Sequence, residues 1–268
     1  MMKVFISADI EGITTTTVWD ECHNSHPSYP LHAEQMTKEV LAACEGAFSG
    51  GATEIVIKDA HGPAINIDPT QIPEHVSLLR NWSGHPYAMV EGIDSSFDCA
   101  MFIGYHSAAG RPGNPLSHTY SGRNTMVRIN GRQTSEFMLY SWACALEGVP
   151  TVMLSGDKML CEDYADLHPA LISVPVKEGI GALSCNYSPV TTLKEIKDAA
   201  RRAVGQDLMD AAAKTTLPEF FSVEVDYKIH ADAEKMSYFP GCRKTSPYTV
   251  AFETGSYFEV LRTLKWIF

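Results

Sequence analysis

Acidic and histidine side chains follow three short apolar segments in the first 106 residues of the chain. The segments 3–8, 54–58 and 99–104 have the character of strands, and the polar residues after them are Asp9, Glu11, Asp59, His61 and His106. In an open α/β sheet, ligands bind beyond the carboxyl ends of the strands, where the residues that follow neighbouring strands meet. Carboxylate and imidazole groups gathered at that edge are typical of a metal site.

Asp9 and Glu11 give the strongest single indication of such a site. They are two residues apart, so on a strand both side chains project to the same face. Two carboxylates at the end of an apolar strand repel each other and lose hydration, and a cation between them offsets both effects. Asp59 and His61 repeat the spacing. Each pair alone also fits a solvated strand end or a hydrogen-bonded loop, but the recurrence on three strands favours a metal site.

The mixture of donors indicates which metal is bound and how many ions there are. Oxygen and imidazole ligands without cysteine suit Zn²⁺, Mn²⁺, Co²⁺ or Fe²⁺, whereas Mg²⁺ and Ca²⁺ prefer all-oxygen shells. The candidate ligands outnumber the protein groups that hold one catalytic zinc. Two metals that share a bridging carboxylate account for the surplus, and such pairs activate water and polarise a carbonyl or phosphoryl oxygen.

His118 is the candidate for an acid, a base or a nucleophile. It lies in the segment 107–123, a long loop rich in Gly, Pro and Ser. Loops of that length in a compact domain are usually functional or disordered. An imidazole titrates near neutral pH, so His118 close to His106 could transfer a proton or attack a substrate. The alternative interpretation is a surface histidine on a loop.

Alternating strands and helices must position these residues. Apolar periodicity predicts a helix over 31–49 between the first two strands, which makes a right-handed βαβ unit. A hairpin around Asn130-Gly131 precedes a helix over 135–147 that carries Glu136 in its first turn. With further buried strands over 149–155 and 171–177, the pattern predicts an α/β fold. We expect a three-layer, mostly parallel sheet with helices on both faces, covering residues 1–187.

Residues 188–268 show a different pattern of elements. The expected order is helix, strand, helix, strand, helix, over 193–204, 221–227, 231–238, 249–253 and 257–267. This order predicts a smaller αβαβα domain of the α+β class. Contacts between subunits are an expected role for this domain.

Composition and charge exclude several classes of function. The 268 residues carry a net charge of −11, which argues against nucleic acid or an anionic membrane as a partner. Seven scattered cysteines without a CxxC pair indicate free thiols in a reducing compartment. We find no signal peptide and no apolar run long enough to span a membrane, so we expect a cytoplasmic protein. No glycine-rich phosphate-binding motif follows a strand.

Several motifs, in this order and at these separations, resemble the D-aminopeptidase family (peptidase family M55) across nearly the whole chain. They are Asp9-Ile10-Glu11-Gly12-Ile13, Lys58-Asp59-Ala60-His61, Gly104-Tyr105-His106, Ser117-His118 and Ser135-Glu136. The resemblance implies a zinc aminopeptidase with two metal ions per subunit. It also implies release of N-terminal D-amino acids, typically D-alanine, from short peptides or amides. A further implication is a homo-oligomer, a decamer of two stacked five-membered rings.

The resemblance also implies roles for individual residues. Asp9 would bridge the two metals, with Glu11 and His61 completing one shell. His106 and Glu136 would complete the other. His118 would correspond to the catalytic histidine, which acts in the family as a nucleophile. Apart from the resemblance, Asp59 is a candidate for a residue that supports the metal ligands by hydrogen bonding.

Three positions depart from the family pattern. Lys58 replaces an Asn or Asp, Ser135 replaces a Gly, and Tyr140 lies where the family has a Gly-Leu-Asn segment. The metal ligands match the family and the pocket walls differ from it. The sequence therefore does not determine which side chain the substrate carries.

Three alternatives to this function remain at the level of sequence. One is another two-metal amidohydrolase, and a second is a phosphoester hydrolase, which the absence of a Gly-Asn-His segment and of a cationic phosphate clamp disfavours. The third is a small-molecule binding protein with a structural metal, whose coordination would be closed.

Overall fold

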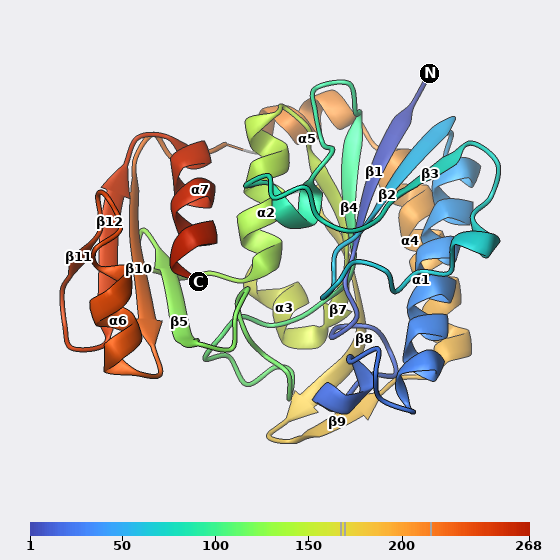
Figure 1. Ribbon diagram of the computed structural model, residues 1–268. Coiled ribbons are helices and arrows are strands. Elements are labelled where there is room, and N and C mark those ends of the chain that lie inside the picture. The colour runs from blue at the N-terminus through green and yellow to red at the C-terminus, as the bar shows by residue number, and fades with distance from the viewer. Residues whose placement is uncertain (167, 169, 215) are drawn as a thin grey trace.

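The computed structural model describes residues 1–166, 168, 170–214 and 216–268, and it contains two sheets (Figure 1). The larger sheet has the strand order β3 (Val76–Leu79), β2 (Glu54–Asp59), β1 (Lys3–Ala8), β4 (Cys99–Tyr105), β7 (Thr151–Asp157), β8 (Ile172–Ile180) and β9 (Leu183–Asn186). All neighbouring strands are parallel except β8 and β9. The predicted α/β class with a mostly parallel sheet is confirmed.

Helices cover both faces of the larger sheet. On one face, α1 (Tyr29–Ser49) and α4 (Pro189–Val204) pack against each other, and both contact strands of the sheet. The approach of these two helices requires Gly46, because a Cβ at this position would lie 2.1 Å from the carbonyl oxygen of Lys197. On the other face lie α2 (Glu136–Leu146) and the short α3 (Lys158–Asp163) (Figure 1). Each face has its own apolar core.

The smaller sheet is antiparallel. Its strand order is β11 (Arg243–Lys244), β12 (Thr249–Thr254), β10 (Phe221–Tyr227), β5 (Asn124–Ile129) and β6 (Arg132–Gln133). Strand β10 buries every second residue, as expected for a strand with one face on a core. That core lies against α7 (Tyr257–Ile267), which contacts α2 of the larger layer (Figure 1). The remaining helices are α5 (Leu208–Lys214) and α6 (His230–Met236).

The elements expected over residues 188–268 are present, but they do not all pack around one sheet. The bounds of β10 and α7 agree with the prediction. Helix α4, expected in the smaller domain, packs on α1 in the larger layer. The hairpin β5–β6, expected in the larger domain, pairs with β10 in the smaller sheet. The two sheets therefore do not divide the chain between residues 187 and 188, because both parts contribute to each layer.

No helix within the described ranges is long and apolar enough to cross a membrane. All seven cysteines are free thiols, and five of them are buried.

Candidate metal centre

Three neighbouring strands end at the edge where the predicted ligands lie. Strand β1 pairs in parallel with β2 on one side and with β4 on the other, and Ala8 is in register with both Asp59 and Ile103. The backbone N–H of Asp9 continues the pairing by donating to the carbonyl of Ile103 at 2.9 Å. The residues that follow β1, β2 and β4 are therefore neighbours in space, as the sequence predicts.

Glycine allows the chain after β1 to lie against the end of β4. The N–H of Gly12 donates to the carbonyl of Gly104 at 2.8 Å. A Cβ at Gly12 would lie 1.7 Å from the carbonyl oxygen of Tyr105, so no other residue fits there. Gly104 has a φ of +73°, which favours glycine. This close crossing brings Glu11 next to the histidine that follows β4.

Two groups of ligand atoms share the Asp9 carboxylate. In the first group, His61 Nδ1 lies 3.4 Å from Asp9 Oδ1 and 2.8 Å from Glu11 Oε2. In the second, His106 Nε2 lies 3.4 Å from Asp9 Oδ2 and 3.7 Å from Glu136 Oε2. Within each group the ligand atoms lie within 4.8 Å of one another. The structure thus brings together all five residues that the sequence analysis named as ligands.

The donor atoms of the two groups fit divalent cations. Asp9 Oδ2, Glu11 Oε2 and His106 Nε2 are buried, and among the described residues none of them makes a regular hydrogen bond, because their polar neighbours are the other ligand atoms at the distances given above. Buried polar atoms without a partner are rare because each costs about 1–3 kcal/mol. A cation that accepts lone pairs from these atoms removes that cost. Zn²⁺ binds this combination of carboxylate oxygen and imidazole nitrogen.

The pKa values of the ligand side chains without metal are shifted by burial and by the neighbouring charges. Burial, and then the nearby Glu11 carboxylate, raise the pKa of Asp9 well above its usual value. Burial also acts to raise the pKa of Glu11, but His61 outweighs this effect and holds it well below its usual value. Burial alone would lower the pKa of His106, yet the Glu136 carboxylate raises it to about 10. The cluster without metal therefore retains protons that divalent cations would displace.

Helix α2 presents Glu136 from its first turn. The Ser135 hydroxyl caps the helix by accepting a hydrogen bond from the N–H of Met138 at 3.2 Å. The backbone N–H of Tyr120 donates to Glu136 Oε1. Tyr120 has a φ of +62°, an unusual conformation for a bulky residue, which directs this N–H at the carboxylate.

His118 lies at the edge of the cluster, on the loop between β4 and β5. Its ring stacks on His106 with centroids 4.3 Å apart, and its Nε2 lies 3.4 Å from Glu136 Oε1. The Nδ1 lies 3.0 Å from the carbonyl oxygen of Leu116, so it carries the proton and leaves a lone pair on Nε2. Burial, and then the neighbouring His106, lower the pKa of His118. The indole of Trp19 meets the ring of His118 edge-on, at a centroid distance of 5.3 Å.

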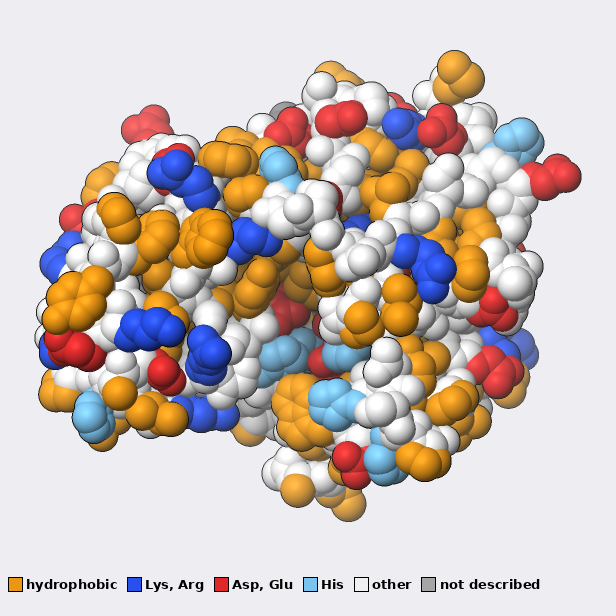
Figure 2. All heavy atoms as spheres, in the orientation of Figure 1, with side chains coloured by type: hydrophobic (Ala, Val, Ile, Leu, Met, Phe, Trp, Pro, Cys, Tyr) orange, Lys and Arg blue, Asp and Glu red, His pale blue; other side chains and the backbone are white. Residues whose placement is uncertain are grey.

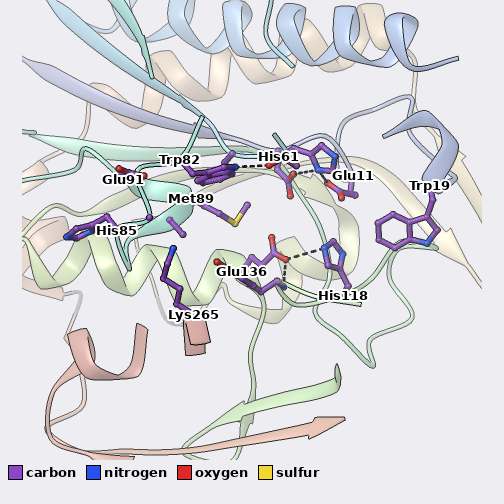
Figure 3. A pocket seen from close by; sticks show the side chains of 16 residues that line it. Glu11, Trp19, His61, Trp82, His85, Met89, Glu91, His118, Glu136 and Lys265 are labelled. Carbon is purple, nitrogen blue, oxygen red and sulfur yellow. Dashed lines mark hydrogen bonds and ion pairs between the residues drawn. The ribbon is translucent and has the colours of Figure 1, made fainter. Parts of the chain in front are cut away.

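A cavity of about 380 Å³ opens onto these ligands. Acidic and histidine side chains are visible at the bottom of the central hollow in Figure 2. Figure 3 shows Glu11 and His61 on one side of the cavity and Glu136 and His118 on the other. Its walls include Trp19, Trp82, Met89, Tyr120 and Lys265. A volume near the lower end of the range for small-molecule sites suits a short substrate.

A sequence model of peptidase family M55, described as D-aminopeptidase, matches residues 2–266. The chain belongs to the D-aminopeptidase family. A D-aminopeptidase of Bacillus subtilis (strain 168) is 26% identical over 266 residues, which cover 98% of this chain and 95% of that protein. A solved structure, the Zn-dependent D-aminopeptidase DppA from Bacillus subtilis, described as a self-compartmentalizing protease, matches with a TM-score of 0.90 at 25% identity. That match covers 99% of this chain and 96% of the other.

Membership in the D-aminopeptidase family confirms the resemblance noted in the sequence. It also confirms that the protein is a hydrolase of the metallo-aminopeptidase class. It leaves the phosphoester hydrolase and the non-enzymatic binding protein without support.

Asp59 supports the loop that carries His61 and lies outside the groups of ligand atoms. Its carboxylate accepts hydrogen bonds from the N–H groups of Asn66 and Ile67, at 2.5 and 2.8 Å, and from the Asn66 amide at 2.7 Å. The same amide donates to the carbonyl of His61 at 2.8 Å. Asp59 therefore fixes the backbone of the loop that carries His61, and it makes no hydrogen bond to the His61 side chain.

The family departure at Lys58 lies outside the groups of ligand atoms. The Lys58 ammonium donates to the carbonyls of Asp59 and Asn81, at 2.9 and 2.6 Å, and lies 3.9 Å from the centre of the Trp82 ring. It thereby holds Trp82, one wall of the cavity. Of the other two departures, Ser135 caps α2 and Tyr140 is buried in that helix. None of the three replaces a ligand atom.

Lys177 is a buried residue near the ligands that the sequence analysis did not name. Its ammonium donates to the carbonyls of Glu11 and Thr16, at 2.6 and 2.5 Å. The Asn114 amide also donates to the Glu11 carbonyl, at 3.1 Å. These bonds fix the backbone of Glu11. A fully buried lysine directly after the apolar residues of β8 is unusual, and its place after Val176 was the signal available in the sequence.

Proposed function

We propose that this protein is a binuclear zinc D-aminopeptidase that releases small N-terminal D-amino acids, such as D-alanine, from short peptides or amides. The observation that supports this most is the Asp9 carboxylate, which is shared between two groups of carboxylate and imidazole ligands. The family supplies the reaction, since the related Bacillus protein is a Zn-dependent D-aminopeptidase. Mn²⁺, Co²⁺ or Fe²⁺ suit the same ligands and are alternatives to zinc.

In this proposal each ligand has one role. Asp9 would hold both ions, Glu11 and His61 would complete the ligands of the first, and His106 and Glu136 would complete those of the second. When bound, such ions polarise a carbonyl oxygen and lower the pKa of water. The net reaction consumes one water, breaks the C–N bond of the first peptide or amide link, and yields a free amino acid and the shortened amine.

His118 acts at the scissile carbonyl through Nε2. The Leu116 carbonyl fixes the proton on Nδ1, so the lone pair on Nε2 is available as a nucleophile or a general base. Burial and His106 keep the pKa low, which favours the neutral ring that either role requires. Stacking on His106 and the edge of Trp19 hold the orientation of the ring.

We also propose that the protein is a cytoplasmic homo-oligomer, with a decamer of two stacked rings as the expected form. The related Bacillus structure is described as self-compartmentalizing, which requires assembly. The free thiols suit a reducing compartment. Light scattering coupled to size-exclusion chromatography measures the mass directly, and a monomer at working concentration would exclude this assembly.

Hydrolysis of paired D- and L-aminoacyl p-nitroanilides by the zinc-loaded protein tests the activity. We expect turnover of the D-alanyl compound, loss of turnover after chelation, and recovery on adding zinc. His118→Ala should abolish turnover and keep the zinc content, whereas His230→Ala, at an exposed position outside the cavity, should change neither. Equal turnover of both enantiomers would exclude selectivity for D-residues. Undiminished turnover in His118→Ala would exclude its catalytic role.

A further inference from the structure

Several acidic groups and a lysine line the cavity. Asp9, Glu11 and Glu136 lie at the ligand end. Among the described residues that line the cavity, Lys265 is the one Lys or Arg. In Figure 3 its side chain points from below into the space between His85 and Glu136. A substrate that extends away from the ligand end meets this ammonium.

Lys265 belongs to a helix whose other residues have packing or surface roles. One face of α7 is buried against the core of the smaller sheet, and its members include Val260, Leu261 and Leu264. Lys265 is half-buried at the border of this face. Arg262, one turn earlier, is exposed and forms an ion pair with Glu259. Lys265 has no such partner, since no described carboxylate lies within 4 Å of its ammonium.

The other titratable residues near this end of the cavity have partners of their own. Glu91 accepts a hydrogen bond from the N–H of Ser83 at 3.2 Å, and its charge acts on Lys58. The ring of His85 meets that of Tyr87 edge-on, with centroids 4.8 Å apart. Neither residue forms an ion pair with the Lys265 ammonium, which therefore remains available to a ligand.

The walls between the two ends of the cavity are largely apolar. Trp82, Ala88, Met89 and Tyr120 line this stretch. Apolar walls suit short aliphatic side chains and exclude water from the ammonium, which strengthens its attraction for an anion. The cavity therefore has ligand groups for a metal-assisted reaction, an apolar middle and a single cation.

We propose that Lys265 binds the C-terminal carboxylate of the substrate, so that the enzyme favours short peptides with a free C-terminus over amides. This inference rests on the proposed function, because it requires the scissile bond to lie at the ligand end. The carboxylate of a short peptide is carried by the leaving part of the substrate, beyond the bond that breaks. The ammonium holds that part in place without taking part in the bond change.

Comparison of D-alanyl-D-alanine with its C-terminal carboxamide tests the subsite, because the two differ only in the group that Lys265 would bind. For the zinc-loaded enzyme we expect the KM of the acid to be about 10- to 100-fold lower, as is typical of a charge-assisted hydrogen bond. Lys265→Met should raise the KM of the acid by the same factor, with little change in kcat or in the carboxamide kinetics. Lys265→Arg should restore most of the difference. Arg262→Met, a charge removed from the exposed side of the same helix, is the matched control.

Calorimetry with a non-hydrolysable D-alanyl-D-alanine analogue gives a second readout that does not depend on turnover. Lys265→Met should weaken binding of the acid analogue and leave that of its carboxamide unchanged, with an unaltered melting temperature and zinc content. Equal KM values for acid and carboxamide in the parent enzyme, unaffected by Lys265→Met, would overturn the subsite while the aminopeptidase activity stands. Failure of the parent enzyme to cleave either compound would instead overturn the proposed function.

Discussion

Replacing Asp9 with asparagine should affect the metal-free and the zinc-loaded protein in opposite directions. Asp9 is 2% exposed and stands in both groups of ligand atoms. Without metal, the charged Asp9 carboxylate destabilises the fold, because burial and the Glu11 carboxylate disfavour the charge and raise the pKa. A raised pKa means that the folded protein holds the proton more tightly than the unfolded chain. Stability therefore falls as pH rises through this window, and a neutral amide avoids the loss.

The size of the zinc effect follows from mass action. Zinc at 1,000 times the dissociation constant of a site stabilises the fold by about 4 kcal/mol for each ion, or about 8 kcal/mol for two ions. At about 2–4 °C per kcal/mol for a chain of this size, the parent protein should melt about 16–32 °C higher with zinc. Loss of the shared ligand should weaken binding of each ion at least 100-fold, since even outer partners of a metal ligand contribute 10- to 100-fold. The shift in Asp9→Asn should then be at most about 6–11 °C.

Differential scanning fluorimetry of chelator-treated protein, with and without added zinc at pH 7, measures both effects. Asp59→Asn is the matched control, because Asp59 is an equally buried carboxylate at the end of the neighbouring strand. Asp59 accepts hydrogen bonds instead of standing among the ligand atoms. Its replacement should lower the stability of both forms by about 1.5–3 kcal/mol. Because Asp59 supports the loop of one ligand, His61, instead of holding both ions, the zinc shift should fall less than in Asp9→Asn. An Asp9→Asn protein that melts lower without metal and keeps the parent zinc shift would refute this reasoning.

Further predictions concern the residues around the ligands. Gly12→Ala should give an insoluble or strongly destabilised protein, because no space exists for the added Cβ. We expect the melting temperature to fall by more than about 5 °C. A normal melting temperature would contradict the close crossing of the chain at Gly12. Lys177→Met should lower stability by about 1–3 kcal/mol and reduce kcat/KM, because the Glu11 carbonyl loses a buried hydrogen-bond donor. Denaturant titration measures the stability and D-alanyl nitroanilide kinetics measure kcat/KM. Lys197→Met, at an exposed lysine, is the control. Zinc binding near pH 7 should release protons, since the pKa of His106 is about 10 without metal. Zinc affinity should consequently rise with pH, and calorimetry in buffers of different ionisation enthalpy counts the protons; no release would contradict the protonated cluster.

Local pattern sufficed for much of the fold and for the ligand set. Strand β10 alternates buried and half-buried residues and helix α7 follows a capping serine, so both have bounds that the sequence shows directly. The ligands could be named because they follow apolar strands, and parallel strands end at a common edge. The family motifs then indicated Glu136, which no strand ending could have indicated.

Which elements pack or pair with each other could not be predicted from the same patterns. The apolar stripe of α4 shows that one face is buried, but it does not show that α1 covers it. Alternation in β5 predicts a strand without naming β10 as its partner. Lys177 and Lys265 carry no motif, since the role of each depends on which distant segment folds against it. The domain division expected at residue 188 differs from the two sheets for the same reason.

Anomalous diffraction at the zinc absorption edge, from crystals of the zinc-loaded protein, tests the central claim most directly. The account predicts two zinc peaks per subunit, both at bonding distance from the Asp9 carboxylate, about 2.0–2.2 Å. One peak should also contact Glu11 and His61, and the other His106 and Glu136. A single peak at full zinc loading, or a second peak away from Asp9, would contradict it.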